Sequence, residues 1–400
     1  MTSCKMFLGD VLGGSGFLGQ HVVRELQERD PRVTEIRVLD LKPYRNCLGH
    51  DVKKPIVSVV ADVTEIETCR TAFQDVSCVI HCAAFVSYDF PADTDRLHRV
   101  NVIGTQNVIR LCQEMNVPRL VFTSTSEVTL VPYFHHGFFS AVVNQTENKA
   151  TCPKDISRLV FSAYAGSKLQ AERFVCEANG TTLKTGEKLR TVALRPTLLY
   201  GEEDRGFIPL IMRVADYCEG NFPRVSGPGG KHQLCYAGNA GWAHVCAKNA
   251  LADNPEVAAG LPFFITDDSP ITDITKLCVR LTQPPGEPSP YSHSWWSLPP
   301  FVTYTLAAIL EPLLGFLLPV LGAGPLPLPP TAAITFLGSI VLYNRLRADL
   351  HLHYAPVYGH QAAHLRALKY YSEEAKRRFV PEERECGGEQ RSQQLQQQLC

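Results

Sequence analysis

A tyrosine and a lysine stand four residues apart in the segment Tyr164-Ala165-Gly166-Ser167-Lys168. On a helix, this spacing places both side chains on one face. A phenol is a weak base at neutral pH because its pKa is about 10, and a neighbouring ammonium favours the phenolate and lowers that pKa. The pair therefore predicts a base that takes the proton of an alcohol while hydride leaves the carbon, with Lys168 also placed to hold a nicotinamide ribose.

Hydroxyl side chains gather before this pair, in the run Phe122-Thr123-Ser124-Thr125-Ser126-Glu127-Val128. The run starts as an apolar strand and ends in polar residues. In open parallel sheets, ligands bind outside the carboxyl ends of the strands. We therefore expect the hydroxyls of this strand end to hydrogen-bond to a substrate oxygen.

A glycine-rich turn, Gly13-Gly14-Ser15-Gly16-Phe17-Leu18-Gly19, opens the first predicted helix. In such turns the first glycine permits the tight bend, the second lets the backbone approach a pyrophosphate, and the third lets the helix pack closely on the strand. Free N–H groups and the positive end of the helix dipole then bind phosphate. Gly13, Gly16 and Gly19 are therefore predicted to hold a dinucleotide.

Acidic residues end the next two predicted strands. Asp40 follows the glycines by about 20 residues, where a carboxylate bonds the adenosine ribose hydroxyls. The same carboxylate would repel a 2′-phosphate, so Asp40 favours NAD over NADP as the cofactor. Asp62 ends the following strand and is predicted to lie beside the adenine.

Short apolar runs alternate with helix-like stretches up to about residue 130, residues 131–160 show no clear pattern, and a helix and a strand follow. Helices are predicted at 17–28, 101–114 and 161–178, because apolar residues recur there at helical spacing. This alternation predicts an α/β fold with a doubly wound parallel sheet. Gly9 and Asp10 fall in the first strand although both are poor β formers. The other predicted strands are 36–40, 56–61, 78–82, 120–123 and 191–194.

Composition excludes several classes of protein. The chain is 45% hydrophobic and 20% charged with a net charge of −1, which argues against disorder and against binding of nucleic acid through bulk charge. The 14 cysteines are too sparse for a disulfide scaffold and lack the paired spacing of a zinc site. We therefore predict no metal and no nucleic-acid partner.

Beyond residue 201 the strand–helix alternation weakens, which predicts a second part of the chain. We expect a Rossmann domain that binds NAD over residues 1–200 and a smaller substrate-binding lobe over residues 201–375. Residues 376–400 are rich in glutamine and have no core-forming pattern, so they are predicted to be a disordered tail.

Taken together, the motifs resemble the extended short-chain dehydrogenases and, more narrowly, the 3β-hydroxysteroid dehydrogenase/Δ5-Δ4 isomerase family. The resemblance covers roughly residues 8–375. The widely shared motifs are GGSGFLG from Gly13, NVIGTQNVI from Asn101, TSTSEV from Thr123 and YAGSK from Tyr164. The narrower ones are ALRPTLLYGE from Ala193, YAGNAGWAH from Tyr236 and ITDDSP from Ile265.

This resemblance implies roles for individual residues. Tyr164 is the expected catalytic base, Lys168 its helper, and Thr125 the third catalytic hydroxyl, a position usually held by serine in the family. Arg195 is expected to border the nicotinamide and count among the cofactor-binding residues. The residues expected to shape the pocket and its lobe are Tyr236, Asn239 and His244.

The family's isomerase chemistry is implied by the acidic pair Asp267-Asp268. A carboxylate there could move a proton from C4 to C6 of a 3-keto steroid, first as base and then as acid. Phe263 and Phe264 stand where relatives often have tyrosines, and a phenyl ring cannot donate a hydrogen bond to a dienolate oxygen. The sequence therefore supports the dehydrogenase more strongly than the isomerase.

An apolar stretch at 301–318 is about as long as a membrane's hydrocarbon core is thick. It contains Glu311, which is costly in mid-bilayer, and Pro312, which is expected to kink a helix. We therefore predict a membrane-associated segment over 295–343 that lies partly inserted or forms a shallow hairpin at the proline-rich turn 325–330. The alternative is a buried helix that covers a steroid pocket.

The function implied by the resemblance is oxidation of the 3β-hydroxyl of a Δ5-steroid with NAD, followed by Δ5-to-Δ4 isomerisation, in steroid biosynthesis. It also implies the endoplasmic reticulum membrane with the catalytic domain facing the cytosol, or a mitochondrial membrane. The expected partners are a steroid or sterol substrate and membrane lipid, with a homodimer through the Tyr164 helix left open. Two alternatives stay open: a decarboxylating sterol-4α-carboxylate 3-dehydrogenase, and a non-catalytic membrane scaffold that binds NAD.

Overall fold

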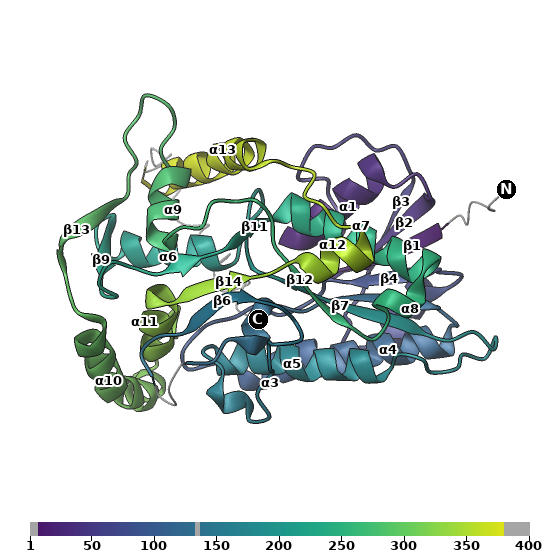
Figure 1. Ribbon diagram of the computed structural model, residues 1–400, viewed down its shortest axis with the longest axis horizontal. Helices are drawn as coiled ribbons and strands as arrows, with labels where there is room; N and C mark the ends of the chain where they lie inside the picture. The colour runs from purple at the N-terminus through teal and green to yellow at the C-terminus, as the bar shows by residue number, and fades with distance from the viewer. Residues whose placement is uncertain (1–6, 133–136, 380–400) are drawn as a thin grey trace, which may run out of the picture.

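Seven parallel strands form the main sheet of the computed structural model, which describes residues 7–132 and 137–379. Their order, β12-β7-β5-β4-β1-β2-β3, runs outward in both directions from β1 and β4 (Figure 1). The predicted doubly wound parallel sheet is therefore confirmed. The strands are β1 (Phe7–Leu12), β2 (Val33–Asp40), β3 (Ile56–Val60), β4 (Cys78–His81), β5 (Arg119–Thr123), β7 (Arg190–Pro196) and β12 (Pro262–Ile265).

Helices cover both faces of this sheet (Figure 1). On one face α1 (Phe17–Arg29) packs against α7 (Ala237–Asp253), and their apolar residues share a core with every second strand residue. On the other face α4 (Gly104–Glu114) packs against α5 (Ser162–Glu177) over the alternate strand residues. The strands are apolar on both faces because both faces are covered. A π-helical turn, His98–Ile103, forms the start of the predicted helix at 101–114.

The first strand does contain Gly9 and Asp10. Asp10 is completely buried, and neither of its carboxyl oxygens has a hydrogen-bond partner among the described residues. Burial raises the pKa of this carboxyl well above its usual value, and the more distant charge of Arg37 offsets this only in part. Burial therefore favours the neutral form of this carboxyl.

The second part of the molecule is built around a small parallel sheet of order β10-β14-β6. Segments from both sides of residue 200 contribute to it, and β12 returns to the main sheet beside β7. Each part of the molecule is thus built from segments that are not contiguous in sequence. The division at residue 200 remains a prediction. The elements of this part are β6 (Ala141–Gln145), β10 (Lys231–His232), β14 (Ile340–Tyr343), α6 (Phe207–Asp216), α9 (Ile274–Leu281), α11 (Pro330–Gly338) and α13 (His360–Phe379).

The predicted tail at 376–400 begins inside helix α13, so residues 376–379 are helical and 380–400 lie outside the described residues. The shorter connecting elements are α2 (Ile66–Cys69), α3 (Thr94–Leu97), β8 (Leu198–Tyr200), β9 (Asn221–Arg224), β11 (Leu234–Tyr236), α8 (Pro255–Ala258), β13 (Ser292–Ser297) and α12 (Leu346–Leu352).

Among the described residues, one helix, α10 (Pro300–Val320), is long and apolar enough to cross a membrane. It continues through Pro312 and packs against α11, at the end of the molecule far from β1, β2 and β3 (Figure 1). Phe301, Ile309 and Phe316 are mostly exposed on it. Because its apolar side chains face outward, the alternative of a buried helix does not describe α10.

Candidate active site

A cavity of about 520 Å³ opens at the carboxyl edge of the main sheet. Backbone and side chains that follow β1, β2, β4, β5 and β7 line it, as expected for a doubly wound sheet. The structure brings together there most of the residues predicted from sequence. These are Gly13, Gly16, Gly19, Asp40, Asp62, Thr125, Tyr164 and Lys168.

The glycine turn is shaped so that side chains would not fit. Gly13 has a φ of +77°, and a Cβ there would lie 2.6 Å from the backbone of Ala83. A Cβ on Gly19 would collide with the carbonyl oxygen of Gly13. The turn is held by the Gly13 N–H, which donates to the Leu39 carbonyl at 2.8 Å, and by the Gly16 N–H, which donates to the Gly13 carbonyl at 3.0 Å. A bare backbone at the start of α1 fits a pyrophosphate.

Asp40 joins the end of β2 to this turn. One carboxylate oxygen accepts a hydrogen bond from the Ser15 N–H at 2.9 Å, and the other accepts from the Leu41 N–H at 2.7 Å. Asp62 accepts from the Thr64 N–H at 2.8 Å. Both carboxylates border the same cavity, so they lie where a ribose and an adenine would be expected.

Tyr164 and Lys168 lie one turn apart on α5 and are 8% and 2% exposed. The Lys168 ammonium lies 4.3 Å from the centre of the Phe122 ring, and burial lowers its pKa to about 8. The pKa of Tyr164 is raised, first by burial and then by the Glu127 carboxylate. The predicted lowering of this pKa by Lys168 is not seen, because the two causes that shift it, burial and the Glu127 carboxylate, both raise it.

Helix α5 is fixed to the loop after β4 by Asn101, which begins the shared motif NVIGTQNVI but was not predicted as a site residue. The Asn101 amide donates to the Ser167 hydroxyl at 2.9 Å and to the Phe85 carbonyl at 3.0 Å, and it accepts from the Phe85 N–H at 2.8 Å. Ser167 lies between Tyr164 and Lys168 in the chain. Asn101 thus orients the face of α5 that bears the predicted base.

The end of β5 supplies hydroxyls to the cavity. The Thr125 hydroxyl oxygen accepts a hydrogen bond from the Glu127 N–H at 3.3 Å, which leaves its own proton available for a ligand. The buried hydroxyl of Ser124 has no hydrogen-bond partner among the described residues. Both residues line the cavity, and the Thr125 hydroxyl is a donor that this strand end offers to a ligand.

Glu127 and Tyr88 form a buried pair in the same cavity, and neither was predicted as a site residue. The Tyr88 hydroxyl donates to Glu127 Oε1 at 2.9 Å, while Oε2 has no partner among the described residues. Burial raises the pKa of Glu127 to about 7, and the Tyr88 hydrogen bond lowers it only in part. The Tyr88 ring lies 5.3 Å from the Tyr164 ring, centre to centre. The feature of the sequence that could have identified Glu127 is its position as an acid within the hydroxyl-rich end of this strand.

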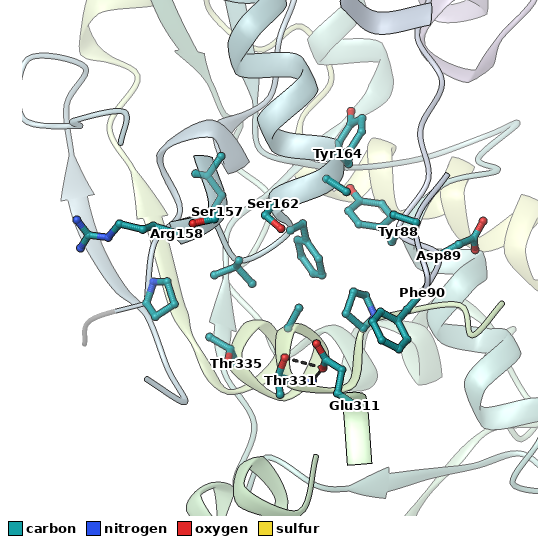
Figure 2. Close-up of a pocket in the computed structure, with 18 of the residues that line it drawn as sticks. Tyr88, Asp89, Phe90, Ser157, Arg158, Ser162, Tyr164, Glu311, Thr331 and Thr335 are labelled. Atoms are coloured by element: carbon teal, nitrogen blue, oxygen red, sulfur yellow. Dashed lines mark hydrogen bonds between the residues drawn. The ribbon is translucent and has the colours of Figure 1, made fainter. Parts of the chain in front are cut away.

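A second cavity, of about 470 Å³, adjoins the first, and Tyr88 and Tyr164 line both (Figure 2). Its walls include apolar side chains from the loop after β4, the start of α5 and helix α11. At the end away from Tyr164, Glu311 of α10 accepts hydrogen bonds from the N–H and the hydroxyl of Thr331, both at 2.7 Å (Figure 2). The apolar walls are formed by Phe90, Pro91, Leu159, Val160, Phe161, Pro329 and Ala332.

The structure places Arg195 outside both cavities. Its guanidinium forms a buried ion pair with Glu172 of α5, with Nε donating at 2.9 Å. The next residue, Pro196, does line the cofactor-side cavity. The geometry thus gives Arg195 a role in joining β7 to α5. The structure does not bring Arg195 to the cavity where the other predicted cofactor-binding residues lie.

Asp267 and Asp268 also lie outside both cavities. The buried carboxylate of Asp267 accepts hydrogen bonds from the N–H groups of Tyr236 at 2.8 Å and Ser269 at 2.9 Å, and from the Asn239 amide at 2.9 Å. Asp268 is exposed and pairs with Arg345 at 2.8 Å. The structure therefore does not bring this pair to Tyr164.

Tyr236, Asn239 and His244 are inside the protein but not on the cavity walls. The Tyr236 hydroxyl donates to Glu202 at 2.7 Å, and the Asn239 amide bridges Asp267 to the Tyr358 carbonyl. The His244 ring bonds the Thr123 hydroxyl at 2.8 Å. His244 thus touches the strand end that bears the hydroxyls, while the other two hold α7.

Comparison with solved structures supports the class of fold. Two UDP-glucose 4-epimerases have similar structures. One, from Stenotrophomonas maltophila with bound NAD, has a TM-score of 0.63 and 15% sequence identity, and the match covers 92% of this chain and 99% of that chain. The other is from Thermus thermophilus in complex with NAD (TM-score 0.60, 19% identity, 91% of this chain and 98% of that chain). At such identities the likeness shows the fold alone, the Rossmann-like fold of extended short-chain dehydrogenases.

Comparison with related sequences identifies the family to which the chain belongs within this class of fold. The chain is 32% identical over 368 residues to 3 beta-hydroxysteroid dehydrogenase type 7 of Mus musculus, covering 90% of this chain and 94% of the relative. It is 31% identical over 364 residues to the protein of the same name from Homo sapiens, with the same coverage. Residues 10–299 match the model of the 3-beta hydroxysteroid dehydrogenase/isomerase family. The chain belongs to this family, and is an oxidoreductase of the hydroxysteroid dehydrogenase type.

Proposed function

We propose that this chain oxidises the 3β-hydroxyl of a Δ5-steroid or sterol with NAD and then isomerises the product to the Δ4-3-ketone. One observation carries the proposal: Tyr164, Lys168 and Thr125 line the same cavity as the glycine turn and Asp40. A base for an alcohol thus lies beside a site shaped for a dinucleotide. Family membership supports a steroid as the alcohol.

The residues fit NAD in three respects. The glycine turn leaves the backbone bare where a pyrophosphate binds. Asp40 can accept hydrogen bonds from ribose hydroxyls and repels a 2′-phosphate. The Lys168 ammonium faces the cavity and can donate to the second ribose. When bound, NAD supplies the acceptor for the hydride that leaves C3.

In the oxidation step, Tyr164 takes the proton of the 3-hydroxyl as the C–H bond at C3 breaks. Thr125 donates a hydrogen bond to the same oxygen and Lys168 favours the phenolate. Burial raises the pKa of the phenol in the protein alone, so the proposal assigns stabilisation of the phenolate to the charged Lys168 ammonium. General base catalysis of this kind contributes about 10²- to 10⁴-fold.

The second cavity supports a steroid as substrate, because its apolar walls begin at Tyr164. A rigid hydrocarbon ring system whose 3-oxygen contacts Tyr164 would extend past Tyr88 toward α10 and α11 (Figure 2). Burial of the rings is favourable by about 25 cal/mol per Å² of apolar area. We therefore propose a ligand with one polar end at the base and a long apolar body, in a cavity whose far end also carries the polar side chains of Glu311 and Thr331.

We also propose that α10 binds the membrane, with the endoplasmic reticulum as its location and the catalytic residues on the cytosolic side. Its exposed Phe301, Ile309 and Phe316 support this, because such a helix buries its apolar side in lipid. Flotation of the full chain with phosphatidylcholine vesicles tests it. A triple change of these three residues to serine should abolish flotation, and persistence of flotation would contradict the assignment.

The catalytic proposal is tested with the full chain in detergent, NAD, and pregnenolone or cholesterol, following NADH formation and the absorbance of the conjugated enone. Both signals should rise. Tyr164→Phe should lower the rate of NADH formation by about 10³-fold or more while the chain still binds NAD. NADH alone would leave a dehydrogenase without isomerase activity. Activity only with a 4α-carboxysterol would favour the decarboxylating enzyme, and NAD binding without turnover of any of these would favour the scaffold.

A further inference from the structure

Glu311 is the one charged residue of the apolar helix α10, Pro300–Val320. A charged side chain in a helix that binds lipid is costly, and such residues face the protein interior or a cavity, where they bind ligands or ions. The neighbouring apolar side chains Leu310, Leu313 and Phe316 are exposed, whereas Glu311 is half-buried and lines the second cavity. The helix thus turns its acid away from its exposed face.

One oxygen of the Glu311 carboxylate has a structural role. Oε2 accepts two hydrogen bonds from Thr331, from its N–H and from its hydroxyl, each at 2.7 Å. Thr331 lies in the first turn of α11, where backbone N–H groups have no partner within the helix. Oε1 makes no hydrogen bond to the described residues and, unlike the oxygens of Asp10, it is not closed off from water. One acceptor of this carboxylate is therefore available to a ligand.

Figure 2 shows the direction of this side chain. Glu311 reaches into the cavity from the wall that lies opposite Tyr164, whereas the charged ends of Asp89 and Arg158, which also line the cavity, point away from it. The walls between these two ends are largely the apolar side chains described above. The cavity therefore has an acceptor at one end and the predicted base at the other.

We infer that Glu311 Oε1 accepts a hydrogen bond from a hydroxyl at the end of the steroid opposite to C3, on ring D or on the side chain at C17. The preferred substrates are then 3β-hydroxysteroids that carry a second hydroxyl at that end. The inference rests on the proposed function, which places C3 at Tyr164. C3 and C17 lie at opposite ends of a rigid ring system, so a steroid held by Tyr164 extends its ring D toward Glu311.

The chemistry of the carboxylate selects a hydroxyl over a ketone. An ionised carboxylate accepts hydrogen bonds and donates none, so Oε1 attracts a hydroxyl and repels the oxygen of a ketone on the same carbon. Tyr304, seven residues before Glu311 on α10, lines the same cavity. A phenol can both donate and accept, so it bonds either group. The preference for a hydroxyl is therefore assigned to Glu311.

The test compares two pairs of steroids that differ only at this end. They are androst-5-ene-3β,17β-diol against 3β-hydroxyandrost-5-en-17-one, and 25-hydroxycholesterol against cholesterol. For the full chain in detergent, NADH formation gives the ratio of kcat/KM within each pair, and binding of the tritiated steroids in the presence of NADH gives the ratio of Kd. Wild type should favour the hydroxyl member of at least one pair by about 10-fold or more, and the pair that responds tells ring D from the side chain.

Glu311→Gln should lower that preference by about 10-fold, because the amide N–H₂ can donate to a ketone and no longer carries the charge. The amide oxygen can still accept both hydrogen bonds of Thr331, so the variant keeps the contact between α10 and α11. Asp89→Asn is the matched control, since it makes the same change on another wall of the cavity. The preference of this control should equal that of wild type.

Each outcome decides the inference. It is overturned if both ratios in Glu311→Gln equal those of wild type, which would leave the carboxylate as a cap of α11 alone, if wild type prefers the ketone, or if Asp89→Asn lowers the preference as much. If wild type oxidises no steroid of either pair, the proposed function fails, and the ratio of Kd then decides the inference by the same criteria. A ratio measured on one preparation does not depend on the fraction of folded protein, so a folding defect would not mimic its loss.

Discussion

Two carboxylates follow strands that lie on either side of β7 in the main sheet, yet their surroundings differ. Asp267, after β12, accepts three protein hydrogen bonds and faces no cavity. Glu127, after β5, lines the cavity that contains Tyr164; its Oε1 accepts one hydrogen bond, from Tyr88, and its buried Oε2 has no partner among the described residues. A carboxylate whose oxygens are all bonded by the protein stabilises the fold, while one left incomplete can bond a ligand.

The two buried cations Arg195 and Lys168 differ in the same way. Arg195 is paired with Glu172, while Lys168 faces the cavity over the Phe122 ring. The position of a residue in the sequence brings its polar group to this edge of the sheet. Whether that group still lacks a hydrogen-bond or ion-pair partner there decides whether it can bind a ligand. Changes around β7 and β12 should therefore alter stability, and changes around β5 and α5 should alter rates.

The largest effect on stability should come from Arg195→Met. It leaves the Glu172 carboxylate buried without its partner, which costs about 3–5 kcal/mol of unfolding free energy. Urea unfolding measures it, and the double variant Arg195→Met/Glu172→Met should recover most of the loss. If Arg195→Met instead unfolds like wild type and weakens NAD binding, the predicted contact with the nicotinamide would be correct and the comparison would break.

A smaller loss is expected for Asp267→Asn, which is the same change in chemistry as Glu311→Gln. The new amide N–H₂ must face one of the N–H donors that now reach a carboxylate oxygen. We expect a loss of about 1.5–3 kcal/mol in unfolding free energy. The comparison is sharpened if this variant, once folded, keeps a wild-type ratio of isomerisation to oxidation, and it is broken if that ratio falls.

The smallest effect should be a gain, from Asp10→Val in β1. The two buried carboxyl oxygens of Asp10 have no hydrogen-bond partner among the described residues, yet Asp10 lines neither of the two cavities described above, so lack of a partner alone does not make a site. Its native pKa is raised, so as pH rises through the unfolded value of about 4 the unfolded chain releases this proton before the folded protein does, and folding becomes less favourable. The variant should be more stable by about 1–3 kcal/mol at pH 7.

Thermal unfolding at neutral pH and near pH 4 measures this gain, which should shrink at the lower pH. The stability of the folded protein near pH 4 includes little of the ionisation cost, because the unfolded chain is then partly protonated as well. A variant that is destabilised at both values would show that Asp10 has a partner in solution, such as a bound water.

Much of the fold could be predicted from the sequence. The strands at 36–40, 56–61 and 78–82 match β2, β3 and β4 closely, because the strands of this parallel sheet are short apolar runs. β12 was not predicted, since Pro262–Ile265 is too short to distinguish from other apolar runs. Its place beside β7 depends on a contact between segments far apart in the chain.

The sequence by itself determined the residues that share the cofactor and base cavity. Their order along the chain places each one at a strand end or on one face of a helix, and parallel strands bring those ends to one edge. Only the tertiary structure decided which polar groups there remain incomplete. That depends on donors from distant segments, such as Tyr88 for Glu127 and Tyr236 for Asp267, whose distances are fixed by packing and not by spacing in the sequence.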